Sequence, residues 1–369
     1  MLPRYDIVIL GGGPAGAAAA ISLRTHAPQL SVAIIERSAY EQPRIGETLP
    51  PIVQPLLAQL GVWESFLTEE HLPAYGACSA WGSEGLESHE FIYGKYGRGW
   101  HLDRRRFDAM LAREAVQHGA QLFMHSRVVD AQQTRDGWRL AMRQGSTSLT
   151  VEAAFVIDAT GRCAAFAARR GAKPIRYDQL VGAFVFLKCT EMHDSYTMVE
   201  ADVDGWWYSA LLPDSGMVAA WMSDADIINK LQSTNPSHWF DQLLKSSHTR
   251  RRLSPAEPMS QPVLQAACSQ QLDQVTGDNW LAIGDAAATF DPLSSQGVVK
   301  ALRTGILASY AIGDWFKGDF SGLTKYRLLI DREFQEYLKT HAEFYGQERR
   351  WATSPFWRRR HAGLSPAPM

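Results

Sequence analysis

The sequence predicts an α/β protein with a Rossmann-type dinucleotide-binding domain, an antiparallel sheet inserted into that domain, and helices at the C-terminal end. Three observations predict this fold class. A glycine-rich turn joins a strand-like run to a helix-forming run near the N-terminus, short strand-like runs follow in the middle of the chain, and helical patterns dominate after residue 296. A chain of 369 residues can hold two domains, each with its own core.

The N-terminal segment has the order strand, helix, strand. Residues 5–10 form a β-branched apolar run, residues 15–24 are strongly helix-forming, and residues 31–36 form a second apolar run that ends on an acid. This order within about 30 residues is the unit that a dinucleotide fingerprint requires.

The glycine-rich turn of this unit fits the G-x-G-x-x-G pattern through Gly11, Gly13 and Gly16. Glycines permit the tight turn, the approach of a pyrophosphate and close packing of helix on strand. The helix that starts near Pro14 and Ala15 offers free N–H groups to the phosphates. Glu36 ends the second strand, where a carboxylate can accept hydrogen bonds from both ribose hydroxyls.

The middle of the chain reads as an antiparallel sheet, and the nucleotide domain is therefore expected to be discontinuous. The expected strands are residues 181–187, 196–203, 206–212 and 217–222, and the later elements are a strand at 280–283 and helices at 296–315 and 323–345. The expected dinucleotide-binding domain comprises residues 1–70, 100–165 and 270–320, the substrate domain 71–99 and 166–269, and a C-terminal helical segment 321–369.

Three segments identify the dinucleotide. Residues 11–16, Asp-Ala-Thr-Gly-Arg at 158–162 and Gly-Asp-Ala-Ala at 284–287 occur in the order seen in aromatic-hydroxylase-like flavoproteins, which the chain resembles over most of its length. The resemblance implies FAD, with Asp285 on the ribityl chain and Gly161 near the cofactor. Asp285 also follows an apolar strand and a glycine, which places it at the carboxyl edge of the sheet, where ligands bind.

Further segments narrow the family and complete the expected cofactor site. Arg104 resembles the arginine of a Leu-Asp-Arg-x-x-Phe-Asp segment that contacts FAD, and residues 44–51 resemble the Gly-Glu-Ser/Thr-x-x-Pro loop of halogenase-like flavoproteins. The turn before the helix at 297 could point backbone N–H groups at the flavin pyrimidine edge. The expected cofactor-binding residues are Gly11, Gly13, Pro14, Ala15, Gly16, Glu36, Arg37, Arg44, Gly46, Arg104, Val128, Asp158, Gly161, Gly284, Asp285, Pro292, Gly297 and Val298.

The chemistry expected on the flavin is monooxygenation. Flavin halogenases carry a Trp-x-Trp-x-Ile-Pro segment and a catalytic lysine soon after the Gly-Glu loop, whereas this chain has adjacent Trp206 and Trp207 and no lysine before Lys95. The remaining interpretation is hydroxylation: the flavin is reduced, reacts with O2 as co-substrate and delivers an oxygen atom to an electron-rich ring. No second glycine fingerprint is present, so NAD(P)H or a separate reductase is expected to supply electrons.

A closer resemblance suggests the substrate. Residues 46–51, 205–210, 291–297 and 348–357 look like the maturation flavoproteins of quinone-bearing amino-acid oxidases. The resemblance implies hydroxylation of a tryptophan in a partner oxidase precursor, on the route to cysteine tryptophylquinone. Glu47 and Trp207 are the candidate catalytic residues at the flavin face, and no catalytic base stands out. The basic, aromatic segment 349–361 is either a protein interface or a packed terminal helix.

Composition excludes several other classes. A net charge of −2 gives no signal for nucleic acid, four widely spaced cysteines indicate neither a disulfide framework nor a metal site, and no apolar run is long enough for a membrane span. We therefore expect a cytoplasmic protein without a bound metal. Two alternatives stay open: a hydroxylase or reductase of a small aromatic or isoprenoid substrate, and a flavin-bound assembly chaperone without catalytic activity.

Overall fold

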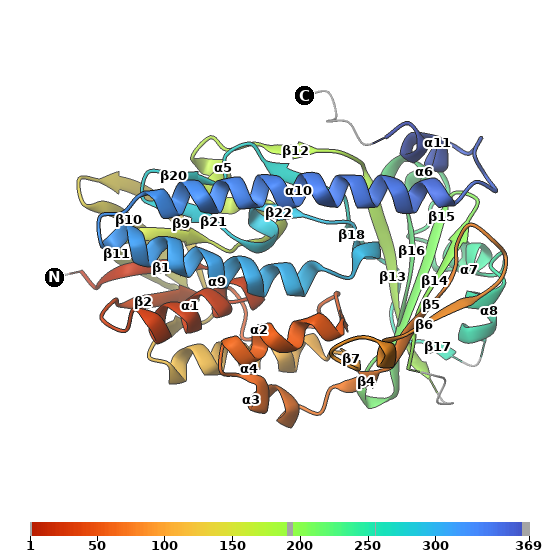
Figure 1. The fold of residues 1–369 in the computed structure, drawn as a ribbon, viewed down its shortest axis with the longest axis horizontal. Coiled ribbons are helices and arrows are strands. Elements are labelled where there is room, and N and C mark those ends of the chain that lie inside the picture. Colours follow the sequence, from red (N-terminus) through yellow and green to blue (C-terminus); the bar gives the residue numbers. More distant parts are fainter. Residues whose placement is uncertain (1, 190–194, 255, 364–369) are drawn as a thin grey trace.

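The computed structural model describes residues 2–189, 195–254 and 256–363; the parts of the expected domain ranges that fall elsewhere lie outside the described residues. Figure 1 shows two sheets side by side, with the long helix α10 (Ser321–Gln347) running across both. The helix therefore links the dinucleotide-binding side to the second sheet. Among the described residues, no helix combines the length and the apolar character needed to cross a membrane.

The first sheet has the strand order β20-β21-β11-β1-β2-β8, in which every neighbouring pair is parallel except β20 with β21. Its central strand β1 pairs in parallel with β2 and β11, and Ile7, Val8 and Ile9 on it are fully buried in a core that includes side chains of α1, α9 and the β9–β10 hairpin. The strands are β1 (Arg4–Leu10), β2 (Val32–Ile35), β8 (Gln121–Phe123), β9 (Ser126–Thr134), β10 (Gly137–Gln144), β11 (Thr147–Asp158), β20 (Thr276–Gly277) and β21 (Trp280–Ala282).

Close helix packing supports this sheet. A Cβ on Gly305 of α9 would lie 2.5 Å from the carbonyl oxygen of Ala15 on α1, so the glycine lets the two helices touch. Asp103 caps α4 by accepting a hydrogen bond from the backbone N–H of Arg105. The helices on this side are α1 (Pro14–His26), α2 (Gln54–Gln59), α3 (Trp63–Thr68), α4 (Arg104–Gln117), α5 (Ala165–Arg169) and α9 (Gly297–Phe316), with 3₁₀ turns at Pro51–Val53, Gly161–Cys163, Gly284–Ala286 and Pro292–Ser294. A further 3₁₀ turn, Phe91–Tyr93, lies against the second sheet.

The second sheet has the order β17-β13-β16-β15-β14-β5-β6, with β18 also paired to β13. Its pairs are antiparallel except for β14 with β5. Its elements are β5 (Gly76–Ala80), β6 (Glu87–Glu90), β13 (Leu180–Cys189), β14 (Thr197–Asp202), β15 (Gly205–Leu211), β16 (Gly216–Asp224), β17 (Ala256–Pro258) and β18 (Val263–Ala266), with helices α6 (Ala225–Lys230), α7 (Pro236–Leu243) and α8 (His248–Leu253) and a 3₁₀ turn at Pro213–Ser215.

Two small sheets join the large ones, and α10 is followed by the short helix α11 (Pro355–His361). The small sheets contain β3 (Thr48–Leu49), β4 (Leu72–Ala74) and β7 (Gly99–His101), and β12 (Pro174–Arg176), β19 (Gln270–Leu272) and β22 (Ala288–Thr289). The expected fold class is confirmed, with a Rossmann-type sheet, a largely antiparallel second sheet and C-terminal helices. The β9–β10 hairpin and helices α6 to α8 were not expected from the sequence.

Candidate active site

The glycine turn between β1 and α1 forms an open cradle. Gly11 has φ +108°, and a Cβ on it would lie 2.3 Å from the carbonyl oxygen of Ala159; a Cβ on Gly16 would lie 1.9 Å from the carbonyl oxygen of Gly11. A Cβ on Gly13 would meet no atom within 4 Å. Gly11 and Gly16 are therefore required by the fold, whereas Gly13 keeps space open before the α1 N-terminus, which has no side-chain cap. This space and the free N–H groups fit a pyrophosphate.

Glu36 at the end of β2 is a buried anion. Its carboxylate accepts hydrogen bonds from the backbone N–H of Gly12 (2.7 Å) and from the backbone and hydroxyl of Ser38 (2.9 and 2.6 Å), and Arg44 lies 3.4 Å away. Burial acts to raise the pKa of Glu36, but these hydrogen bonds outweigh it and hold the pKa below its ordinary value. The ribose contact expected for Glu36 stays a prediction, and a ribose would compete with Ser38.

A buried carboxylate that the sequence did not indicate holds the loop after β2. Asp108 of α4 is fully buried, and Arg104 donates to both of its oxygens at 3.0 and 3.1 Å. Arg44 forms a third contact to it at 2.9 Å. Arg104 also donates to the carbonyl oxygens of Ile45 and Gly46 at 2.8 and 3.3 Å. Arg104 therefore fixes the loop that carries Gly46 and Glu47, and any contact of its own with FAD stays a prediction.

Asp285 is a carboxylate at the carboxyl edge of the first sheet. Lys300 lies 2.8 Å from it and Arg162 3.8 Å, yet 38% of its side chain is exposed. Burial acts to raise the pKa of Asp285, but Lys300 and Arg162 outweigh it, so the pKa lies below its ordinary value. Gly284 has φ +58°, and a Cβ there would lie 2.8 Å from the Cβ of Ala15. Asp285 is thus an ionised carboxylate that two cations fix beside the glycine turn and that is still partly exposed. Such a carboxylate fits the role of acceptor for the ribityl hydroxyls of FAD.

Asp158 is a buried carboxylate whose hydrogen bonds stay within its own loop and the start of α5, and its expected contact with FAD stays a prediction. It is fully buried, and its oxygens accept four hydrogen bonds, two from the backbone and hydroxyl of Thr160 and one each from the backbone N–H groups of Phe166 and Ala167. Its side chain is committed to the loop and to the start of α5, so the geometry gives it no free oxygen for FAD. Gly161 in this loop has φ +72° and open space where a Cβ would stand.

The turn before α9 leads to a second uncapped helix N-terminus. Gly297 begins α9, no side chain caps the helix, and a Cβ on Gly297 would meet no atom within 4 Å. Val298 is buried and Pro292 is exposed. The open N–H groups at Gly297 and Val298 fit the expected flavin contact, which stays a prediction. The contacts with FAD that the sequence predicts for Arg37, which is exposed, and for Val128, which is half-buried, also stay predictions. So do those of Pro14 and Ala15 at the start of α1.

Glu47 belongs to a chain of hydrogen bonds that joins the two sides of the molecule. The hydroxyl of Tyr208 donates to Glu47 and lies 2.6 Å from the Thr48 hydroxyl, which is 3.2 Å from that of Thr197. His101 Nε2 lies 3.0 Å from the Thr197 hydroxyl. Burial first, and then the Glu47 carboxylate, raise the pKa of Tyr208 well above its ordinary value. Tyr208 therefore stays a neutral donor that orients Glu47.

Trp207 does not belong to this group, and its burial in the second core gives no support to the expected place at the flavin face, which stays a prediction. Its side chain is fully buried and packs against Trp221 and Trp239, with ring centroids 6.5 and 5.0 Å apart. Side chains alternate along a strand, so Trp206 and Tyr208 of β15 face the other way. Trp206 donates to the hydroxyl of Tyr345 on α10 at 2.9 Å. The sequence could not decide which face of the sheet each of the two adjacent rings takes.

This position gives a prediction for Trp207. Truncation to alanine is expected to lower the free energy of unfolding by about 3–5 kcal/mol, because a large core side chain is lost. The affinity of the folded fraction for FAD should not change, because Trp207 faces away from the Glu47 side. Denaturant unfolding and FAD titration of the same preparation would check both expectations. A loss of FAD affinity at unchanged stability would contradict this position.

The C-terminal segment is packed, which favours the terminal-helix interpretation over an interface. Phe356 and Trp357 are fully buried. Arg360 lies 2.9 Å from Asp224 and Arg359 lies 2.7 Å from it, so these cations are neutralised within the chain.

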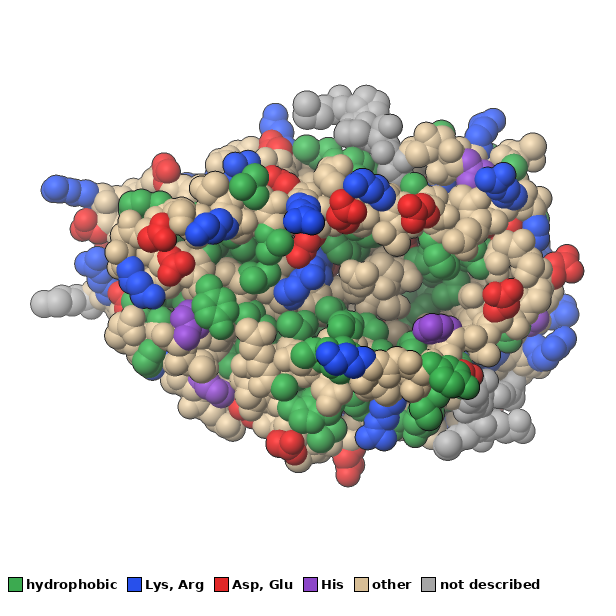
Figure 2. Space-filling model, in the orientation of Figure 1, with side chains coloured by type: hydrophobic (Ala, Val, Ile, Leu, Met, Phe, Trp, Pro, Cys, Tyr) green, Lys and Arg blue, Asp and Glu red, His purple; other side chains and the backbone are tan. Residues whose placement is uncertain are grey.

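A cavity of about 560 Å³ lies between the 290–296 segment and α10, and the sequence did not indicate it. Figure 2 shows a hollow with hydrophobic side chains on the face that α10 crosses. Aromatic and aliphatic side chains make up much of the wall, and Arg303 pairs with Glu333 at 2.5 Å among the lining residues. The aromatic and aliphatic lining residues are Phe290, Leu293, Leu329, Tyr337, Phe344 and Tyr345.

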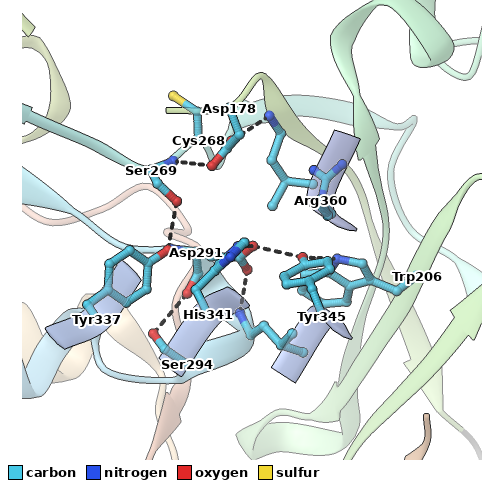
Figure 3. Close-up of polar contacts among 12 residues, drawn as sticks. Asp178, Trp206, Cys268, Ser269, Asp291, Ser294, Tyr337, His341, Tyr345 and Arg360 are labelled. Atoms are coloured by element: carbon cyan, nitrogen blue, oxygen red, sulfur yellow. Dashed lines mark hydrogen bonds and ion pairs between the residues drawn. The ribbon is translucent and has the colours of Figure 1, made fainter. Parts of the chain in front are cut away.

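Asp291 joins this cavity to the turn before α9 (Figure 3). Its Oδ2 accepts hydrogen bonds from Tyr345 at 2.8 Å and from His341 at 3.2 Å, and its backbone N–H donates to Tyr337 at 2.8 Å. Its Oδ1 accepts from the backbone N–H of Leu293 at 2.9 Å. The three α10 partners recur every four residues and so share one helix face. That spacing is a signal from which the sequence could have indicated this wall.

The comparisons with known proteins agree with this geometry. The model of the family described as FAD binding domain matches residues 4–318. The chain belongs to this family. LodB of Marinomonas mediterranea, described as an FAD-dependent oxidoreductase, is 32% identical over 365 residues, which is 97% of each chain.

Solved structures share the fold. The myxobacterial chondrochloren halogenase CndH superposes with a TM-score of 0.88 over 97% of this chain and 86% of its own, at 20% identity. QhpG, a peptidyl tryptophan dihydroxylase essential for tryptophylquinone cofactor biogenesis, superposes with a TM-score of 0.79 over 97% of this chain and 78% of its own, at 24% identity. The family model and the similarity to LodB confirm the expected cofactor FAD and the expected class of FAD-dependent oxidoreductase.

Proposed function

We propose that this protein is a monooxygenase that hydroxylates a tryptophan of a partner amino-acid oxidase precursor during formation of cysteine tryptophylquinone. The observation that carries the proposal is the aromatic-lined cavity, which shares Asp291 and Leu293 with the turn leading to the uncapped start of α9. Its volume of about 560 Å³ lies within the range of about 300–1,000 Å³ typical of ligand sites. It can take an indole side chain.

Similarity to known proteins supports the same proposal. LodB matches essentially the whole chain, and QhpG, which shares the fold, is named for dihydroxylation of a peptidyl tryptophan. A protein substrate would keep its backbone outside the cavity, near Arg332 and Glu336, two charged lining residues that are exposed. The aromatic wall would receive only the side chain.

The reaction would consume O2 and NAD(P)H, or the electrons of a separate reductase. In balance, R–H + O2 + NAD(P)H + H⁺ gives R–OH + H2O + NAD(P)⁺. Bound FAD supplies electron transfer and oxygen activation. The chain would hold FAD through the Gly11–Gly16 turn, Glu36 and Asp285, and it would hold the ring of the substrate through the aromatic wall. Tyr208 would keep the carboxylate of Glu47 in one orientation by its hydrogen bond.

Halogenation is less well supported, although halogenases share the fold. The described cavity wall contains no lysine, and the ammonium of Lys300 is committed to Asp285 and to the carbonyl oxygen of Ala288. Lys95, the first lysine of the chain, is exposed. No amine is therefore in place on this wall to direct an oxidised halide.

A cytoplasmic location of the protein stays a prediction.

Co-expression with an oxidase precursor tests the proposal. We expect the tryptophan of the precursor to gain about 16 or 32 Da, one or two oxygen atoms, in mass spectrometry of its peptides. The matched control is a Gly13→Ala variant, which should fold but not hold FAD. An unmodified tryptophan with the wild-type enzyme, or the same oxidation with the control, would exclude this function and favour the chaperone alternative.

The small-molecule alternative has its own test. Purified holoprotein is mixed with NADH and with free aromatic compounds, and flavin reduction is followed by absorbance. Rapid reduction that a small phenol or indole stimulates, with turnover of that compound, would favour a metabolite hydroxylase. We expect no turnover of free compounds, because the proposed substrate is a tryptophan that its own polypeptide holds in place.

A further inference from the structure

His341 has an incomplete set of hydrogen bonds at the cavity wall. It lies on α10, is 7% exposed, and is one of the residues that line the cavity. Its Nε2 lies 3.2 Å from Asp291 Oδ2, whereas its Nδ1 is buried without a hydrogen-bond partner among the described residues. Buried polar atoms of native proteins are nearly always paired, so an unpaired one at a cavity wall calls for a partner from outside the chain.

Asp291 determines which ring nitrogen carries the proton. Its carboxylate accepts from Leu293 and Tyr345 as well as from His341. Burial acts to raise the pKa of Asp291, but the interactions with His341, Leu293 and Tyr345 outweigh it and hold the pKa below its ordinary value. An ionised carboxylate only accepts hydrogen bonds, so Nε2 carries the proton that it donates. In the neutral form of the ring, Nδ1 is then an acceptor.

The ring is also held in place. It stacks on Tyr345 with centroids 4.3 Å apart and an interplanar angle of 28°, and it meets Tyr337 edge-on at 5.8 Å. The hydrogen bond to Asp291 and the contacts with the two tyrosines favour this one orientation of the imidazole. The ring therefore holds one oriented acceptor just behind the aromatic wall.

We infer that Nδ1 of His341 accepts a hydrogen bond from the ring N–H of an indole bound in the cavity. An indole nitrogen is a donor only, which complements an acceptor held in this tautomer. Because Nδ1 is buried, one bridging water or a small shift of the wall completes the contact. The inference rests on the proposed function and deepens it, since it names the substrate atom that is recognised. Asp291 is a positioning residue, because it acts through His341.

The test compares two probes on the FAD-loaded enzyme, N-acetyltryptophanamide and its 1-methyl derivative, which lacks the indole N–H. Dissociation constants are measured by calorimetry. We expect the wild type to bind the unmethylated probe about tenfold more tightly, the effect of one hydrogen bond of about 1.4 kcal/mol. His341→Phe should bind both probes with similar affinity. Glu343→Gln, an exposed position on the same helix, should keep the tenfold ratio.

Two further variants separate recognition from folding. His341→Asn carries a side-chain oxygen near the position of Nδ1, so it should restore part of the discrimination that His341→Phe loses. Asp291→Asn should abolish discrimination, because its amide can donate to Nε2 and so move the ring proton to Nδ1. A merely structural role would not change the ratio of two affinities. Retained flavin absorbance and an unfolding curve establish that each variant is folded.

The outcomes also separate this inference from the proposed function. Equal wild-type affinities for the two probes, or no binding of either, would overturn the inference even if the partner tryptophan is oxidised in co-expression. A tenfold ratio that His341→Phe removes would uphold it even if no oxidation of a partner is found, and only the proposed reaction would then be wrong.

Discussion

Gly13→Ala is expected to give a folded protein that no longer holds FAD. The backbone of Gly13 is extended, with φ −72° and ψ −175°, and a Cβ on it would meet no atom within 4 Å, so the chain itself tolerates alanine. The added methyl group would occupy the space before the α1 N-terminus, where the pyrophosphate has to approach the free N–H groups. We expect FAD affinity to fall at least tenfold, about 1.4 kcal/mol, with unchanged stability of the apoprotein.

Gly16→Ala is the matched comparison, because its Cβ would lie 1.9 Å from the carbonyl oxygen of Gly11. The clash is with backbone, so we expect loss of folded protein, at a cost above about 4 kcal/mol. Apoprotein unfolding curves and FAD titrations distinguish the two variants. Equal destabilisation by both, or full FAD binding by Gly13→Ala, would contradict the assigned roles.

Local patterns were sufficient for much of the fold. The β-branched run before Gly11 and the alanine-rich run after it predicted β1 and α1, because strand and helix preferences there agree with the buried environment. The glycines, Glu36 and Asp285 were placed by motifs whose spacing follows from strand-turn-helix geometry. Their contacts with FAD stay predictions.

Other site residues depend on contacts between distant segments, which no local pattern reports. Asp108 meets Arg44 across 64 positions, and Tyr208 meets Glu47 across 161. His341 gains its role only because the turn at Asp291 packs against α10. Strand orientation was a second obstacle, because all side chains change faces when a strand is turned over, and adjacent tryptophans offer no polarity difference to fix its orientation.

Asp158→Ala is the second substitution with a large expected effect, and it should act on stability before cofactor binding. The carboxylate is fully buried and satisfies three backbone N–H groups and the hydroxyl of Thr160. Alanine would leave these buried donors without partners, which costs about 1–3 kcal/mol for each donor that water cannot reach. We expect a loss of about 3–5 kcal/mol in the free energy of unfolding of the apoprotein.

The chemistry of the replacement side chain sharpens the expectation. Asp158→Asn keeps one acceptor oxygen but turns an amide toward N–H groups of the loop, so it should lie between wild type and alanine in stability. Asp136→Asn, an exposed change, is the control and should have no effect. If FAD affinity falls in Asp158→Asn while apoprotein stability is unchanged, then the carboxylate contacts the cofactor directly, as the sequence suggested. If the stability of the apoprotein falls in Asp158→Asn, then the aspartate acts on FAD binding by shaping the loop that carries Gly161.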